Sequence, residues 1–214
     1  MKKNLIIYGA SAPDVLKIVG AINKNKPTWN IKGFIDDTPE KQGKEFFSHI
    51  IIGGIKKISE FDIDSIYFFN NVYRTTADRR TVAKKLEKNN CRLISLIHPN
   101  TDILMTEIGT DVIIEDKVAI GAYVRIADHC CIKRAASLGH ESKIDRFVFV
   151  GPGATLCGRV HVGEGAYIGA RSCILEELKI GRNSVIGAGS VVTRDVPPNI
   201  TVVGTPARPL FPQR

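Results

Sequence analysis

Aliphatic side chains recur at every sixth position through the second half of the chain. From Ile108 to Val192 this position is always Ile, Leu or Val. In a chain that is 43% hydrophobic, chance does not produce so long a series without a break. A hexapeptide period is typical of a β-helix, in which short strands bury their apolar sides by stacking on their neighbours. The series is Ile108, Ile114, Ile120, Ile126, Ile132, Leu138, Ile144, Val150, Leu156, Val162, Ile168, Ile174, Ile180, Ile186 and Val192.

The rest of each hexad agrees with this prediction. Gly often follows the aliphatic residue, which suits a corner that needs unusual backbone angles or a close backbone approach. Four positions after the aliphatic residue the side chain is usually Val, Ala or Ser, which fits the inside of a tight corner. An amphipathic helix would need apolar residues at a spacing of 3.6 instead. Because three hexads form one triangular coil, residues 108–192 predict about four to five coils without an inserted loop.

The first half of the chain has a different pattern, in which buried strands alternate with helices. Such alternation favours a parallel, Rossmann-like sheet. The expected strands are 4–8, 31–35, 50–52, 65–69 and 91–96, and the expected helices are 14–25, 55–60 and 75–89. The two patterns meet at His98-Pro99, so we expect one domain over 1–97 and a second over 98–214.

A ligand of such a sheet binds beyond the carboxyl ends of its strands. That rule brings the segment Gly9–Pro13, the pair Asp36-Asp37 and the pair Gly53-Gly54 to one crevice. The phosphate-binding signature Gly-x-Gly-x-x-Gly is absent after the first strand, since only Gly9 is present. Two interpretations stay open for this loop: nucleotide binding, or an ordinary helix start in which Ser11 is the cap and Asp14 faces the positive helix end.

Composition narrows the class of partner. The net charge of +8 fits nucleic acid or anionic small molecules, and the lack of a nucleic-acid motif favours the small molecules. No signal-peptide pattern leads the sequence, so we expect a cytoplasmic protein without a membrane segment. The five cysteines have no metal-type spacing and are expected to be reduced and mostly structural, and no metal is expected.

The whole chain resembles the bacterial sugar acetyltransferases with hexapeptide repeats. The features that carry the resemblance are the hexads after a small Rossmann-like domain, the join Ile97-His98-Pro99, and two closing runs, GSVVTRDVPP at 189–198 and VGTPA at 203–207. The family includes sialic acid O-acetyltransferases and N-acetyltransferases of nucleotide-linked 4-amino sugars. The resemblance implies a left-handed parallel β-helix, acetyl-CoA as co-substrate and a homotrimer with its active sites between subunits.

The resemblance also assigns catalytic residues. A His followed by an acidic residue inside a hexad is the family's general base, and here that pair is His140-Glu141. Imidazole suits the role because its pKa lies near working pH, and Glu141 would orient the ring. Gly158 lies eighteen residues later, which is one coil, and the resemblance gives its backbone N–H to the developing oxyanion. The other histidines of the coils, His129 and His161, are expected to be ordinary surface side chains.

Contacts with the acetyl donor and with the acceptor are implied in the same way. For acetyl-CoA they are the backbone of Gly158, Ala170, Ala188 and Pro206. For the acceptor they are Gly9, Ser11, Asp36, Asp37, Gly53, Asn71, Lys133 and Phe149.

Three acceptor positions depart from the family pattern. Ser11-Ala12-Pro13-Asp14 replaces a Gly-rich loop with a His, Lys133 replaces an Asn, and Phe149 replaces a second His. Acetyl transfer is therefore better indicated than any particular acceptor. Lys133 and Arg134 near the pocket would favour an acidic or phosphorylated acceptor, and a solvated basic patch is the alternative.

The leading hypothesis is an acetyl-CoA-dependent acetyltransferase for a sugar, in particular N-acetylation of a nucleotide-linked amino sugar in surface glycan synthesis. The acceptor would attack the thioester directly, and Cys157 is the nucleophile to exclude. The alternatives are O-acetylation of sialic acid or another acidic sugar, transfer of a different acyl group, and a non-catalytic trimeric scaffold. The pair His140-Glu141 in an otherwise monotonous coil is the feature that argues against the scaffold.

Overall fold

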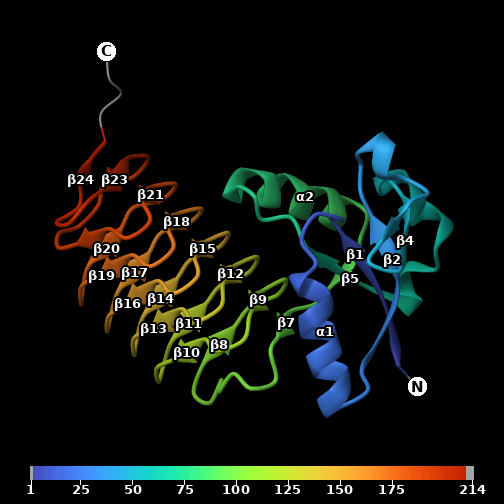
Figure 1. Ribbon diagram of the computed structural model, residues 1–214, viewed down its shortest axis with the longest axis horizontal. Coiled ribbons are helices and arrows are strands. Elements are labelled where there is room, and N and C mark those ends of the chain that lie inside the picture. Colours follow the sequence, from blue (N-terminus) through green and yellow to red (C-terminus); the bar gives the residue numbers. More distant parts are fainter. Residues whose placement is uncertain (1, 211–214) are drawn as a thin grey trace. The chain divides into compact units, whose positions relative to one another are not determined.

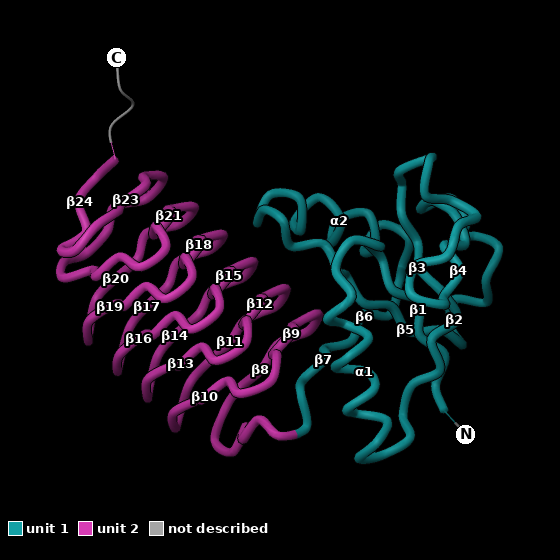
Figure 2. The backbone as a smooth tube through the Cα atoms, viewed as in Figure 1, with its two compact units in different colours: residues 1–99 teal, residues 100–214 magenta. Residues whose placement is uncertain are grey.

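Residues 2–210 of the chain are described by a computed structural model. Contacts divide the chain into two compact units, residues 1–99 and 100–214, which we call unit 1 and unit 2 (Figure 2). The boundary between the two units lies after residue 99. This is two residues beyond the domain boundary that the sequence predicts, which is after residue 97. Each unit has its own architecture and its own core.

Unit 1 contains one six-stranded sheet in the order β3-β4-β2-β1-β5-β6 (Figure 1). All neighbouring strands are parallel except β3 and β4, which form an antiparallel hairpin at the edge. The chain moves from β1 outward to β2 and returns to the other side of β1 at β5, so the winding reverses between β1 and β5. The strands are β1 (Lys3–Tyr8), β2 (Trp29–Ile35), β3 (Glu45–Phe46), β4 (His49–Gly53), β5 (Ile66–Asn70), β6 (Arg92–Leu93) and, outside this sheet, β7 (Leu96–Ile97).

The helices of unit 1 differ in two respects from the prediction. The segment 55–60 is a 3-10 helix, η2, a form that proteins use in short connecting pieces. Helix α1 has Pro13 at its N-cap and no side-chain cap, so Ser11 does not cap it. The helical elements are α1 (Asp14–Asn25), α2 (Thr76–Lys88), η1 (Pro39–Lys41), η2 (Ile55–Glu60) and η3 (Ile63–Ser65).

Unit 2 is built from two-residue strands, each paired in parallel with the strand one coil later. Leu138 pairs with Leu156, which confirms that one coil is eighteen residues. Three sheets form the sides of the prism: sheet I is β10-β13-β16-β19-β22, sheet II is β20-β17-β14-β11-β8, and sheet III contains, from unit 2, β24-β23-β21-β18-β15-β12-β9 (Figure 1).

The strand bounds are β8 (Glu107–Ile108), β9 (Ile113–Ile114), β10 (Ala119–Ile120), β11 (Arg125–Ile126), β12 (Cys131–Ile132), β13 (Ser137–Leu138), β14 (Lys143–Ile144), β15 (Phe149–Val150), β16 (Thr155–Leu156), β17 (His161–Val162), β18 (Tyr167–Ile168), β19 (Cys173–Ile174), β20 (Lys179–Ile180), β21 (Val185–Ile186), β22 (Val191–Val192), β23 (Thr201–Val203) and β24 (Arg208–Pro209).

The hexad series forms the core of unit 2. From Ile126 to Val192 every member is at most 2% exposed, and only the early members Ile108 and Ile120 are partly open. The Val, Ala and Ser four positions later are also almost all buried, on the inside of the corners. The register is unbroken, so each coil stacks its aliphatic residues on those of the next. The predicted fold class, a small Rossmann-like domain followed by a parallel β-helix, is confirmed.

Close approach, and not left-handed backbone, explains the glycine that follows the aliphatic residue. A Cβ on Gly151 would lie 2.7 Å from the backbone nitrogen of Ala170, and one on Gly163 would lie 2.8 Å from that of Arg182. Neither glycine has a positive φ. The left-handed position comes two residues later, and non-glycine residues such as Glu141 and Arg159 mostly occupy it.

Candidate active site

The pair His140-Glu141 occupies the corner between β13 of sheet I and β14 of sheet II. The Nδ1 atom of His140 lies 3.0 Å from Oε2 of Glu141, and both side chains are about half exposed in the single chain. The hydrogen bond from His140, followed by the charge of Arg159, lowers the pKa of Glu141. The carboxylate is therefore ionised at neutral pH.

This geometry fixes the tautomer of a neutral His140. An ionised carboxylate only accepts hydrogen bonds, so Nδ1 must carry the proton that is donated to Glu141. The other ring nitrogen, Nε2, is then unprotonated and has a lone pair to take up a proton. The arrangement is that of a general base with its orienting carboxylate.

Gly158 lies against the Nε2 side of that ring. A Cβ built on Gly158 would be 2.6 Å from Nε2 and 2.9 Å from Cε1 of His140, so the imidazole occupies the space that any other residue type would fill. The backbone N–H of Gly158 donates to no acceptor within residues 2–210. The structure thus places a free N–H donor beside the basic nitrogen, one coil along the helix.

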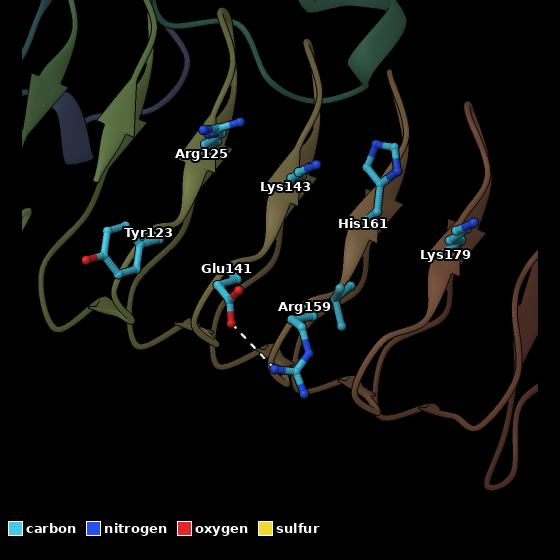
Figure 3. Close-up of a pocket in the computed structure, with 8 residues that line it drawn as sticks. Tyr123, Arg125, Glu141, Lys143, Arg159, His161 and Lys179 are labelled. Carbon is cyan, nitrogen blue, oxygen red and sulfur yellow. Dashed lines mark hydrogen bonds and ion pairs between the residues drawn. The ribbon is translucent and has the colours of Figure 1, made fainter. Parts of the chain in front are cut away.

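Arg159 extends the site along the same corner, and the sequence analysis missed it. Its guanidinium contacts Glu141 at 3.5 Å (Figure 3). It also contacts Glu177 at 2.9 Å. These residues are eighteen apart, so the coil period that identified Gly158 also predicts this ladder of alternating charge. Arg159 and His140 thereby contact the same carboxylate oxygen, Oε2 of Glu141.

Cys157 precedes Gly158, and its thiol has the wrong acidity for a nucleophile at neutral pH. Burial, followed by the nearby Cys173 and Glu176, raises the pKa of the Cys157 thiol. A thiol reacts as its thiolate, so raising this pKa suppresses its reactivity.

The other two histidines of the coils also have carboxylate partners. Nε2 of His161 lies 3.1 Å from Asp145, and Nδ1 of His129 lies 3.0 Å from Asp111. His129 is 3% exposed and its ring stacks on Phe147. A carboxylate partner alone therefore does not distinguish the candidate base.

The residues expected to contact acetyl-CoA lie on two different corners of the prism. Gly158 shares the corner between sheets I and II with His140, whereas Ala170 and Ala188 lie on the corner between sheets III and I. The N–H groups of Ala170 and Ala188 donate to no acceptor within the described part of the chain. Pro206 follows a cis peptide bond in the exposed tail segment.

Two acceptor candidates of unit 2 are already engaged. The Lys133 ammonium is buried against Glu115, whose second oxygen accepts from the backbone N–H and the side chain of Arg134. The ammonium of Lys133 is thus paired within the chain, whereas the side chain of Arg134 is partly exposed. Phe149 stacks face to face on Tyr167 with 4.6 Å between ring centroids.

The acidic acceptor candidates of unit 1 bind the chain itself. Asp36 accepts from Ala10 N–H, Thr38 N–H and Lys41. Although burial acts to raise the pKa of Asp36, the hydrogen bonds from Lys41 and Thr38 hold it below its usual value.

Asp37 has an equally complete set of partners. It accepts from Tyr8 at 2.6 Å, Lys85 at 2.6 Å and the Ile55 N–H at 2.7 Å. Burial, followed by the hydrogen bond to Asp37, raises the pKa of the Tyr8 phenol. Asp36 and Asp37 therefore stabilise the loops at the carboxyl ends of the strands by accepting hydrogen bonds from the chain itself. A hollow lined by Asp37 and Gly54 lies at this edge of the sheet.

The remaining candidates of unit 1 surround the reversal between β1 and β5. Gly9 follows β1, and a Cβ there would meet Val72 at 2.7 Å. Asn71 follows β5 and donates to the carbonyls of Gly9 and Ala12, but its buried Oδ1 has no donor within the described residues. Ser11 is exposed on the same loop. Gly53 ends β4, so it lies at the carboxyl edge of the sheet.

Two further kinds of feature are absent from the described residues. No group of three or more His, Cys, Asp or Glu side chains in residues 2–210 is arranged to hold a metal ion. No helix in that part of the chain is long and apolar enough to span a bilayer.

The resemblance expected from the sequence is confirmed by comparison with known proteins. The family described as "Bacterial transferase hexapeptide (six repeats)" matches residues 159–194. Serine acetyltransferase 3, mitochondrial, of Arabidopsis thaliana is 35% identical over 136 residues, which are 62% of this chain and 31% of that protein. This chain spans about a third of the length of the curated relatives that it matches first.

Solved structures match over nearly the whole chain. The acetyltransferase domain of PglB from Neisseria gonorrhoeae is 25% identical to this chain, with a TM-score of 0.88. The match covers 98% of this chain and 100% of that one. The same domain has also been solved in complex with acetyl coenzyme A. PerB from Caulobacter crescentus, solved with CoA and GDP-perosamine, has a TM-score of 0.89 at 23% identity over 97% of both chains, a likeness of fold.

Proposed function

We propose that this chain, which carries the repeat and the fold of the hexapeptide transferases, is an acetyl-CoA-dependent acetyltransferase that acts on a nucleotide-linked amino sugar. One observation carries the proposal: Nε2 of His140 lies 2.6 Å from the position of a Cβ on Gly158, beside a backbone N–H that has no acceptor in residues 2–210. A base next to a backbone donor is what acyl transfer to an amine requires.

The residues act in a single displacement. The acceptor amine attacks the thioester carbonyl, Nε2 of His140 removes a proton from the nitrogen, and the Gly158 N–H donates to the oxygen that becomes negative. When the tetrahedral intermediate collapses, the carbon–sulfur bond breaks and CoA leaves as a thiol with the proton returned by the imidazolium. Glu141 holds the ring and stabilises its positive charge.

The raised pKa of Cys157 supports direct transfer over an acetyl-enzyme. A two-step route would need a thiolate at this position, and burial opposes it. The acetyl group therefore passes straight from CoA to the acceptor in a ternary complex.

For the acceptor, we favour an amino sugar with a nucleotide diphosphate, in surface glycan synthesis. PerB, which shares the fold, was solved with GDP-perosamine. In unit 1, Asn71 after β5 is hydrogen-bonded to the loop after β1 at the reversal of the sheet, which is where ligands of such sheets bind.

A second copy of the chain completes the proposed site. Gly158 and the pair Ala170 and Ala188 have N–H groups without an acceptor in the described residues, and they lie on different corners of the prism. This placement fits a CoA that lies between two copies of the chain. We propose a homotrimer on this ground. The free cysteines agree with a reducing compartment, and we propose that the enzyme acts in the cytoplasm, where acetyl-CoA is available.

The test is release of CoA thiol from acetyl-CoA with a panel of nucleotide-linked amino sugars, free amino sugars and sialic acids. The proposal predicts turnover with a nucleotide-linked amino sugar, an N-acetyl product by mass spectrometry, and loss of turnover in His140→Ala. His49→Ala is the matched control, since His49 lies on β4 of unit 1 and has no part in the proposed chemistry. An O-acetyl product would instead establish the sialic acid type of activity, and turnover unchanged in His140→Ala would refute the assigned base.

A further inference from the structure

The three faces of the β-helix differ sharply in charge. At the outward position of sheets I and III, the central strands carry uncharged side chains. At the same position sheet II carries Glu107 and then four consecutive residues with basic side chains. The uncharged residues are Ala119, Ser137, Thr155, Cys173 and Val191 on sheet I and Ile113, Cys131, Phe149, Tyr167 and Val185 on sheet III, and the basic ones are Arg125, Lys143, His161 and Lys179 on sheet II. We call this row of four the basic stripe.

The basic stripe is continuous, because its members are direct neighbours across parallel strands. Arg125 pairs with Lys143, Lys143 with His161, and His161 with Lys179 (Figure 3). Neighbouring strands are about 4.8 Å apart, so the stripe spans about 14 Å. Like charges that face each other across strands destabilise a sheet. Folding alone therefore does not favour this arrangement.

Carboxylates of the chain neutralise only part of the stripe. Arg125 contacts Glu107 at 3.2 Å, and His161 contacts Asp145 at 3.1 Å. Lys143 and Lys179 are exposed, and neither has a carboxylate within ion-pair distance in the described part of the chain. Two uncompensated ammonium groups thus remain, on either side of His161.

The stripe also forms the floor of a hollow that reaches the candidate catalytic corner. All four stripe residues line it, together with Glu141 and Arg159 (Figure 3). Four of these six side chains are permanent cations and one is a carboxylate. A molecule that lies in this hollow would therefore meet a positive field next to the carboxylate that orients His140.

We infer that the basic stripe binds the phosphates of a diphosphate ester, with Lys143 and Lys179 as the principal contacts. This inference rests on the proposed function, since acetyl-CoA and a nucleotide-linked sugar are both diphosphate esters. Lys143 and Lys179 are two strands apart, about 10 Å, which suits a ligand that carries more than one phosphate. Ammonium groups bind phosphate as point charges and need no fixed orientation.

The experiment measures equilibrium binding by calorimetry, which needs no turnover. The probes are acetyl-CoA, S-acetylpantetheine, which has no phosphate diester, UDP and GDP. The test variant is the double substitution Lys143→Gln/Lys179→Gln. Its matched control is Lys117→Gln/Lys84→Gln, which removes two exposed lysines outside the hollow. Light scattering and thermal unfolding of each variant are recorded in the same buffer.

The inference predicts that the test variant binds at least one diphosphate ester about tenfold more weakly, while the control binds as the wild type does. If the test variant binds acetyl-CoA more weakly but binds S-acetylpantetheine as the wild type does, the stripe is the site for the phosphates of CoA. If the test variant has a weaker affinity only for UDP or GDP, the stripe is the site for the phosphates of the sugar nucleotide.

Three results would overturn the inference. Unchanged affinity of the test variant for every probe would show that the stripe binds no phosphate. A changed oligomeric state of the test variant would make the stripe a contact between copies of the chain. If the wild type binds none of the probes, the inference and the proposed function are both overturned. If the wild type turns over but the test variant binds every probe with unchanged affinity, only the inference is overturned.

Discussion

Substitution of Gly158 by Ala tests the geometry of the proposed base directly. The added Cβ would lie 2.6 Å from Nε2 of His140, whereas carbon and nitrogen atoms in contact are about 3.6 Å apart. The imidazole must therefore move by about 1 Å or rotate away. Because the His140 side chain is about half exposed, it has room to do so.

The displacement should affect activity and stability in opposite directions. A misplacement of about 1 Å at a reacting group costs about 100-fold in rate, or about 2.7 kcal/mol in the barrier. The backbone of Gly158 is not in the left-handed region, so Ala fits it and removes freedom from the unfolded chain. That substitution raises the free energy of unfolding by up to about 1 kcal/mol. We expect a slow enzyme that is at least as stable as the wild type.

The assay compares kcat from CoA thiol release, the Kd of acetyl-CoA and the thermal midpoint. Gly20→Ala on α1 is the control, because a Cβ there meets nothing within 4 Å. It should gain up to about 1 kcal/mol of stability and keep full turnover. Full turnover in Gly158→Ala would refute the reasoning, since the base would then tolerate displacement from Gly158. Unfolding of Gly158→Ala would also contradict it.

Three other substitutions follow from the same structure. Glu141→Gln should lower kcat about 10- to 100-fold with little change in KM, because the ring loses the anion that orients it. Cys157→Ser should retain turnover, since the thiol is not the nucleophile, and loss of activity in a folded Ser variant would argue for an acetyl-enzyme. Asp36→Asn should lower the free energy of unfolding by about 1–3 kcal/mol at neutral pH. The folded-state pKa of Asp36 is below its usual 3.8, so its contribution is present above that value and is lost as pH falls through the folded-state pKa. Urea unfolding at neutral and acid pH measures this difference, and an equal loss at both would exclude the ionic origin.

The second half of the fold was predictable because its register is rigid. A period of six with Ile, Leu or Val throughout specifies the coil, and the coil then places Gly158 next to His140 across eighteen residues. The same eighteen-residue period also predicts the basic stripe, because it brings Arg125 next to Lys143 on the neighbouring strand. The sequence analysis followed the period for inward residues only and therefore missed this outward row.

The first half was less predictable because its contacts are distant in sequence. Asp37 looked available for a ligand, but its partner Lys85 lies forty-eight residues later on α2. Ser11 looked like a helix cap because it precedes Pro13, yet the helix begins without a side-chain cap. Local propensity identified most strands and helices, but it does not show which polar side chains the fold itself uses.

The most direct test of the central claim is a comparison of wild type and His140→Ala at saturating acetyl-CoA and amino sugar, with the Kd of acetyl-CoA measured for both. The account predicts that turnover falls by at least about 100-fold in His140→Ala while the Kd stays the same, because His140 moves a proton and does not hold the donor. Equal turnover in the two proteins, or a wild type that neither binds acetyl-CoA nor releases its thiol, would contradict it.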